Sequence, residues 1–132
     1  NSAAADFLLV GEGPMEVEMR RVISRLGLES HCRIVPFQKN IWPMLHIADI
    51  LVLTSHEESF GLVLIEAGAC ECAVVATRSE GPSEIVADGE TGFLVERADE
   101  QGLAARLDQL VIDDGLCERM GRAGAERVRE LF

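Results

Sequence analysis

The stretch ADILVLTSHEESFGLVLIEAGA, residues 48–69, determines most of what can be said about the fold. Its apolar run at residues 50–54 has the length and composition of a strand buried on both faces. The apolar residues after the polar loop predict a helix over residues 60–70, for which Ser59 is a suitable N-terminal cap. A buried strand followed closely by a helix is the first half of a βαβ unit, so this stretch predicts a parallel sheet.

Strands and helices alternate along the rest of the chain. Further strands are predicted at residues 6–10, 33–37, 73–77 and 92–95, and helices at residues 14–26, 43–49, 82–87 and from residue 99 onward. The strand at residues 6–10 is also expected to be buried on both faces. The expected architecture is α/β, a Rossmann-like parallel sheet with helices on both faces. A length of 132 residues suits one domain rather than two, so residues 1–132 are predicted to form a single domain.

The charge balance excludes several classes of partner. The formal net charge is −11 and the pI is about 4.6, which argues against nucleic acid and against binding an anionic membrane by charge. An anionic ligand would have to be held by local dipoles and a few arginines, because the field of the whole chain repels it. We see no apolar segment of the roughly 18 residues that a membrane span needs and no signal peptide, so we expect a cytoplasmic protein.

The four cysteines do not have the spacing of a metal site. Cys32, Cys70, Cys72 and Cys117 form no C-x-x-C pair. We therefore expect reduced thiols and no metal. The chain does not begin with Met and enters directly into a predicted strand, which suggests a fragment.

The loop at residues 55–59 follows the carboxyl end of a parallel strand, which is where ligands bind in such sheets. The first amides of the next helix, at Phe60, Gly61 and Leu62, would have no partner inside the helix and would carry the positive end of its dipole. Gly61 has no side chain to block an approaching ligand. The pattern predicts a phosphate seat, and an ordinary capped helix start is the alternative.

Two glutamates, Glu58 and Glu66, indicate a ligand site more strongly than the loop does by itself. Glu66 lies five residues beyond Gly61, about 7.5 Å along a helix axis, where a carboxylate can accept the two hydroxyls of a ribose. An unpaired buried charge is costly, so Glu66 needs a partner, either a ribose or an arginine such as Arg78. Glu58 would accept hydroxyls of a neutral sugar, or simply pair with the helix dipole. The hypothesis requires that Glu66 face the cleft and that the protein's own side chains leave the amides free.

The segment EESFGLVLIEAGACECAVVATRSEGPSEIVADGETGFLV, residues 57–95, resembles the signature region of retaining GT-B glycosyltransferases, the group 1 or family 4 set. The upstream segments LLVGEGP, residues 8–14, and ADILVLTS, residues 48–55, resemble the nucleotide-binding domain of the same family. The resemblance covers nearly the whole chain, with several motifs in order. It implies the carboxyl-terminal domain of a GT-B fold without its first strand and helix.

The resemblance also implies a donor site. The donor would be a nucleotide diphosphate sugar of UDP or GDP type, used without a cofactor for retaining hexosyl transfer in polysaccharide biosynthesis. Glu58 would contact the donor sugar and is the candidate catalytic residue, and Glu66 would bind the ribose. The remaining donor-binding candidates are Ser59, Phe60, Gly61 and Leu62 near the diphosphate, Gly11 in the turn that lines the cleft, and Pro36 and Phe37 against the base.

The chain also departs from the family pattern. Residues 71–73 read Glu-Cys-Ala where the family has Gly-x-Pro, and Glu80 precedes Gly81 where the family has two glycines. Glu80 is expected to put bulk and charge near the sugar. Gly68 stands where a methionine is common, which weakens the helix slightly.

Three parts of the family fold have no counterpart in the chain: the acceptor domain, the first strand and an Arg/Lys clamp on the diphosphate. The fragment alone is therefore expected to be inactive. Either residues 6–10 pair directly with residues 50–54, or another chain fills the gap, so an oligomer or a rearranged edge is expected. A nucleotide-sugar epimerase domain and a truncated, non-catalytic module remain alternatives. The sequence leaves the base, the sugar and the acceptor undecided.

Overall fold

The computed structural model describes residues 4–132, which form two compact units. The first unit extends to Ile41 and the second is Trp42–Phe132. We describe each unit by itself. Both are built from parallel strands flanked by helices, which confirms the α/β fold class. The prediction of one domain over residues 1–132 stays a prediction.

The first unit is a single βαβ motif. Strand β1 (Phe7–Val10) leads into helix α1 (Glu16–Arg25), and β2 (Cys32–Val35) returns parallel to β1, with Phe7 opposite Cys32 and Val10 opposite Val35. Gly27 adopts a φ of +66°, a conformation suited to glycine, just after the helix ends. Strand β2 ends one residue before Pro36, which has no amide hydrogen to donate to a sheet.

The expectation that β1 is buried on both faces is wrong. Phe7 and Leu8 are each 44% exposed and Val10 is 38% exposed. Within its own unit β1 pairs with β2, and β3 pairs with β4. Direct pairing of residues 6–10 with residues 50–54 stays a prediction. Association with another chain through the edge of β1 or of β3 stays a prediction as well.

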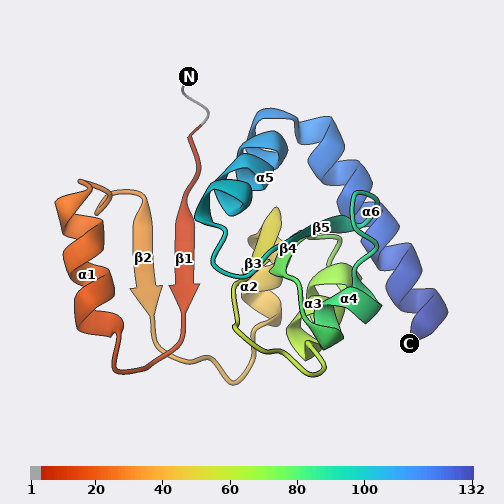
Figure 1. Ribbon diagram of the computed structural model, residues 1–132, viewed down its shortest axis with the longest axis horizontal. Coiled ribbons are helices and arrows are strands. Elements are labelled where there is room, and N and C mark those ends of the chain that lie inside the picture. The colour runs from red at the N-terminus through yellow and green to blue at the C-terminus, as the bar shows by residue number, and fades with distance from the viewer. Residues whose placement is uncertain (1–3) are drawn as a thin grey trace. The chain divides into compact units, whose positions relative to one another are not determined.

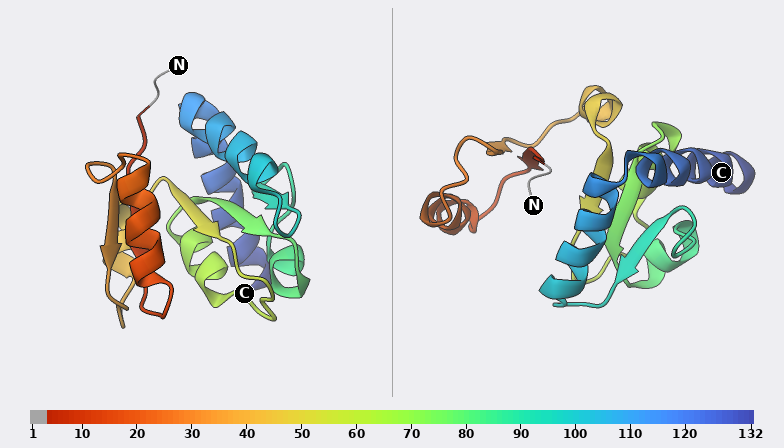
Figure 2. Two further views of the ribbon diagram at one scale, coloured as in Figure 1. Left: turned by 60° about the vertical axis from the view of Figure 1, so that its left-hand side comes forward. Right: turned by 90° about the horizontal axis from the view of Figure 1, so that it is seen from above.

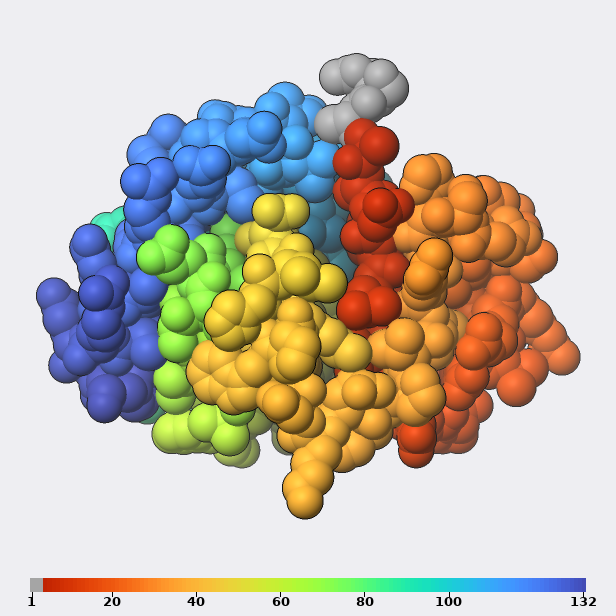
Figure 3. Space-filling view, turned by 180° about the vertical axis from the view of Figure 1, so that it is seen from behind, coloured from red at the N-terminus to blue at the C-terminus, as the bar shows by residue number. Residues whose placement is uncertain are grey.

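The second unit is a three-stranded parallel sheet in the order β3-β4-β5 (Figures 1 and 2). Its elements are α2 (Trp42–Ile47), β3 (Ile50–Leu53), α3 (Leu62–Ala69), β4 (Ala73–Thr77), α4 (Glu80–Ile85), β5 (Gly92–Val95), α5 (Glu100–Ile112) and α6 (Asp114–Leu131). Helix α2 lies at the surface (Figure 3), and its residue Ile47 is 80% exposed. No helix among the described residues is long and apolar enough to cross a membrane.

The core of the second unit surrounds its central strand. All five residues of β4 are buried, as expected for a strand covered on both faces. Ala73 and Val75 of this strand belong to an apolar cluster with Phe93 and Val95 of β5. Residues Leu110, Cys117 and Met120 from α5 and α6 complete the same cluster. The carboxyl ends of the strands are thereby fixed by a packed core.

All four cysteines are free thiols, and Cys72 is part of the packed core. Cys72 is fully buried and donates its S–H to the carbonyl oxygens of Leu45 and Ala48, at 3.2 and 3.3 Å. Burial is the main cause that raises the pKa of Cys72 to about 11. A thiol with so high a pKa remains protonated at neutral pH and is a poor nucleophile.

Helices α3 and α6 approach each other closely at Gly68. A Cβ atom on Gly68 would lie 2.7 Å from Cγ2 of Val128 and 3.4 Å from the carbonyl oxygen of Gly124. Gly68 is itself buried. The residue that weakens the isolated helix is thus required by the packing of the two helices.

We expect Gly68→Ala to lower the free energy of unfolding by about 1–3 kcal/mol, because overpacking forces neighbours off their preferred positions. Gly115→Ala is the matched control on α6, since its Cβ would meet only the side chains of Arg119 and Asp113. The control should be neutral or slightly stabilising, because alanine favours helix by about 1 kcal/mol. Urea denaturation followed by circular dichroism measures both, and equal stability of the two variants would contradict the packing role.

Candidate functional site

Helix α3 begins two residues later than predicted. Its first residue is Leu62, and Gly61 precedes it with a φ of +81° and a ψ of +48°, in the left-handed region. Ser59 is exposed and makes no capping hydrogen bond. The expected cap at Ser59 is therefore wrong, because the turn at Gly61 places the serine outside the reach of the helix amides.

The carboxylate of Glu58 occupies part of the predicted phosphate seat. Its Oε1 atom accepts hydrogen bonds from the amide of Gly61 at 3.1 Å and, more weakly, from the amide of Phe60 at 3.5 Å. The expectation that both amides are free is wrong in this structure. Within the described chain, the amides of Leu62 and Val63 have no hydrogen-bond acceptor. Glu58 thus plays the simpler of its two predicted roles, a negative charge at the positive end of a helix.

The amino-terminal end of α4 holds the same loop from the other side. The carbonyl oxygen of Glu58 accepts hydrogen bonds from the amide of Gly81 at 2.9 Å and from the hydroxyl of Ser79 at 3.4 Å. A Cβ atom on Gly81 would lie 2.6 Å from the carbonyl carbon and oxygen of Phe60. The sequence analysis did not predict this role for Ser79 and Gly81, although the two-glycine loop of the resembled family pointed to the segment.

Glu66 has no partner from the protein. It is half-buried on α3, and its carboxylate has no hydrogen bond or ion pair within residues 4–132. Burial first, and the Glu66 charge second, raise the pKa of the Cys70 thiol one helical turn further on. Glu66 and Gly68 lie two residues apart and so on roughly opposite faces of the helix. The carboxylate therefore faces away from α6, against which Gly68 packs.

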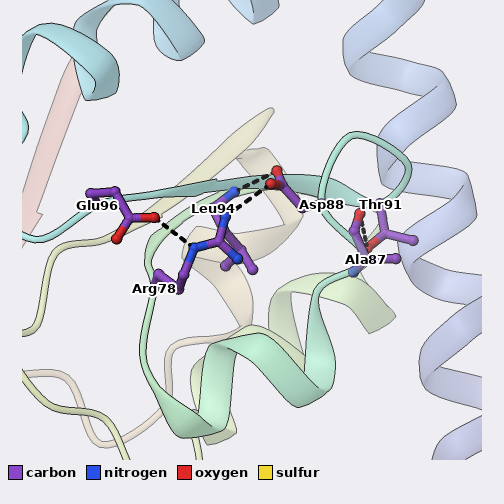
Figure 4. A network of polar contacts seen from close by, with 6 residues as sticks. All are labelled: Arg78, Ala87, Asp88, Thr91, Leu94 and Glu96. Atoms are coloured by element: carbon purple, nitrogen blue, oxygen red, sulfur yellow. Dashed lines mark hydrogen bonds and ion pairs between the residues drawn. The ribbon is translucent and has the colours of Figure 1, made fainter.

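The arginine that could have neutralised Glu66 is bound elsewhere. Arg78 donates to Oε1 of Glu96 at 2.8 Å and to Oδ2 of Asp88 at 3.1 Å (Figure 4). Its hydrogen bond to Glu96, and then that to Asp88, raise the pKa of the guanidinium. Asp88 also accepts the amide of Leu94 at 2.9 Å, which ties the network to β5. Pairing between Glu66 and Arg78, which the sequence left open, does not occur.

The first unit brings together some of the residues predicted to contact a base. Gly11 follows β1 with a φ of +144°, and its amide donates to the carbonyl oxygen of Val35 at 3.0 Å. This bond extends the pairing of β1 and β2 into the turn. A hollow of about 300 Å³ adjoins it, and its lining residues are Glu12, Glu16, Arg20, Ile34 and Pro36.

On the wall of the hollow Arg20 forms an ion pair with Glu16 at 2.8 Å, and Glu12 adds a further carboxylate. Phe37, which was predicted beside Pro36, is 69% exposed and is not among the lining residues. Pro36 and the Gly11 turn therefore share one end of this unit, while Phe37 points into solvent.

Comparison with protein families gives one clear match. A family model described as "Glycosyl transferases group 1" matches residues 3–127. The N-acetyl-alpha-D-glucosaminyl L-malate synthase of Bacillus anthracis is 38% identical over 97% of this chain, which spans 34% of that protein. The lipopolysaccharide core biosynthesis glycosyltransferase LpsE of Rhizobium meliloti is 34% identical over 89% of the chain, which spans 35% of it. The chain thus covers about a third of the length of these relatives.

Solved structures agree with the sequence match. Alr3699/HepE from Anabaena, solved in complex with UDP, has a TM-score of 0.89 at 28% identity, over 97% of this chain and 37% of its own. The C-terminal domain of the glycosyl transferase group 1 family protein LpcC from Francisella tularensis has a TM-score of 0.86 over 97% of this chain and 85% of its own. At 24% identity the second likeness shows the fold alone.

We expect Gly81→Ala to displace the loop before α3, because the new Cβ meets backbone atoms that cannot rotate away. The free energy of unfolding should fall by about 2 kcal/mol, in the range of overpacking in a well-packed core. Glu80→Ala, one residue earlier at an exposed position, is the control and should leave stability nearly unchanged. Thermal denaturation compares the two, and equal melting temperatures would contradict the steric role of Gly81.

Proposed function

This chain belongs to the glycosyl transferases group 1 family, and we propose that it binds a nucleotide diphosphate sugar as the donor for glycosyl transfer. The donor would sit at the carboxyl ends of β3 and β4, beside the start of α3. The observation that carries the proposal is the half-buried carboxylate of Glu66, which the protein leaves without a partner. Such a group needs hydrogen-bond donors, and a ribose supplies two hydroxyls.

The diphosphate would be held by backbone amides rather than by cationic side chains. The amides of Leu62 and Val63 point out of the first turn of α3 and have no acceptor in the described chain. No arginine or lysine occurs in residues 55–61. A helix start of this kind attracts an anion by its dipole and its free N–H groups together.

Glu58 would have to release its amides when the donor arrives. A phosphate and a carboxylate cannot share the amides of Phe60 and Gly61, because two anions at hydrogen-bond distance from the same donors repel each other. We propose that the carboxylate then accepts hydroxyls of the donor sugar. The freed amides, with those of Leu62, would stabilise the charge that develops on the departing nucleotide diphosphate during a retaining transfer.

The first unit would supply the base subsite. The turn at Gly11 adjoins the hollow of about 300 Å³ described above, which Pro36 helps to line, whereas the exposed ring of Phe37 would have to turn toward a base to contact it. A relative of known structure, Alr3699/HepE, was solved with UDP, which favours a UDP-type donor over a GDP-type one. The acceptor would bind to parts of the protein outside these residues, since the relatives are about three times longer. We therefore propose that this piece alone is inactive in transfer.

One observation favours a different outcome. The carboxylate of Glu58 already satisfies the amides of Phe60 and Gly61, as expected of a non-catalytic module that folds without binding a donor. Isothermal titration calorimetry with UDP, GDP and ADP separates the two proposals. Heat with one nucleotide supports the donor site, and no heat with any of them supports the inert module.

We expect Glu66→Ala to weaken nucleotide binding by roughly 10- to 100-fold, since a hydrogen bond to a charged group contributes about 1.5–3 kcal/mol. The loss should be the same for UDP and for UDP-glucose, because the ribose is common to both. Glu126→Ala is the matched control, an exposed helical glutamate on α6 with the same change in charge. Calorimetry measures both variants, and equal affinities would exclude a ribose contact at Glu66.

Glu58→Ala should change the affinity for UDP and the affinity for UDP-glucose in different ways. Removing the carboxylate frees the amides of Phe60 and Gly61, so UDP should bind more tightly by about 1 kcal/mol, the typical net value of one hydrogen bond. UDP-glucose should gain less or lose affinity, because it also loses an acceptor for its sugar hydroxyls. The ratio of the two dissociation constants, measured by calorimetry, is the readout. An unchanged ratio would show that Glu58 does not contact the sugar.

A further inference from the structure

The aromatic ring of Phe132, just after α6, contacts the loop that precedes α3. The ring of Phe132 lies 6.4 Å from the ring of Phe60, centroid to centroid, with an interplanar angle of 80°. This is the edge-to-face arrangement that aromatic pairs favour. Neither ring belongs to the core, because Phe60 is 54% exposed and Phe132 is 60% exposed.

Phe132 is placed at the loop by a firmly anchored helix. Its amide donates to the carbonyl oxygen of Val128 at 2.9 Å, which continues the hydrogen bonding of α6 to the end of the chain. One turn earlier, Arg127 donates to the carbonyl oxygens of Ile85 and Glu84 at 2.7 and 2.9 Å. These bonds tie the end of α6 to the end of α4, whose other end contacts the loop.

The side chain of Phe60 takes no part in the hydrogen bonds that hold Glu58 and Gly61. Glu58 is fixed through its carbonyl oxygen by Gly81 and Ser79, and Gly61 through its amide by the Glu58 carboxylate. Between them, the ring of Phe60 projects outward and meets Phe132. A backbone movement at Phe60 would displace its own amide and that of Gly61, because these amides belong to the two peptide units on either side of its Cα atom.

We propose that Phe132 is a positioning residue for the donor site: through the ring of Phe60 it holds in place the loop that carries the amides of Phe60 and Gly61. The inference rests on the proposed function. Phe132 itself touches no donor and acts through the loop alone. Because both rings are more than half exposed, the contact contributes little to the stability of the fold and acts mainly on the order of the loop.

The test compares Phe132→Ala with Leu131→Ala. Leu131 is the neighbouring residue at the end of α6, is similarly exposed at 52%, and is not part of the ring contact with Phe60. Phe132→Ala should raise the dissociation constant of UDP-glucose by about threefold to tenfold, the size expected for loss of one aromatic pair. Its melting temperature should match that of Leu131→Ala. Phe132→Tyr keeps the ring edge and should restore the affinity.

A second readout needs no ligand. In ¹H–¹⁵N spectra of the free chain, Phe132→Ala should shift the amide resonances of Phe60 and Gly61 and speed their hydrogen exchange, while Leu131→Ala should leave them in place. The inference is overturned if Phe132→Ala matches Leu131→Ala in these spectra and in affinity, or if it lowers the melting temperature in proportion to its effect on binding. If the unaltered chain binds neither UDP nor UDP-glucose, the proposed function fails, and the amide spectra alone decide whether Phe132 orders the loop.

Discussion

The arrangement around the candidate site depends on one close approach, that of the amino-terminal end of α4 to the backbone of residues 58–60. Only glycine fits at position 81, because a Cβ atom there would lie 2.6 Å from the carbonyl carbon of Phe60 and 2.8 Å from the carbonyl oxygen of Glu58. The same approach lets the Gly81 amide bind the Glu58 carbonyl oxygen. Steric exclusion and a hydrogen bond thus act together to fix the loop, and the loop in turn fixes where α3 begins.

An acidic chain that takes an anionic ligand faces an electrostatic conflict. With a net charge of −11 the chain repels a diphosphate at long range. The helix amides attract it at short range, but in the structure the Glu58 carboxylate already satisfies two of the amides near the start of α3. Because the carboxylate accepts their hydrogen bonds, these amides are not left unpaired in a partly buried loop, which would cost free energy. The protein therefore stabilises its free state with an internal anion, and the proposed donor would have to bind strongly enough to replace it.

The sequence predicted the regular elements well and the loop poorly. The bounds of β4 and β5 agree with the prediction, because a run of buried apolar residues is a local signal. The start of α3 was placed two residues too early, since the left-handed turn at Gly61 interrupts a pattern of apolar residues that continues through it. Burial of β1 was overestimated, because an apolar run does not reveal whether both of its edges and faces find partners.

The residue types at the candidate site were predictable, but their pairings within the protein were not. The spacing of Glu58 and Glu66 indicated two carboxylates near one helix start, and both are there. Which of them is paired depends on contacts between segments distant in sequence. Arg78 pairs with Glu96, just after β5, and with Asp88, in the turn before β5, so Glu66 remains unpaired. No short sequence pattern could therefore have indicated which carboxylates Arg78 pairs with.

The departure of this chain from the two-glycine loop of its family can now be divided into a steric part and an electrostatic part. The steric requirement lies entirely at Gly81, where a Cβ has no room. Position 80 is exposed and is the first residue of α4, where a glutamate interacts favourably with the helix dipole. The fold therefore tolerates Glu80 without strain. Glu80 also adds a negative charge directly before Gly81, whose amide binds the Glu58 carbonyl oxygen. If the proposed donor binds at this loop, the charge of Glu80 would weaken its binding without disturbing the fold.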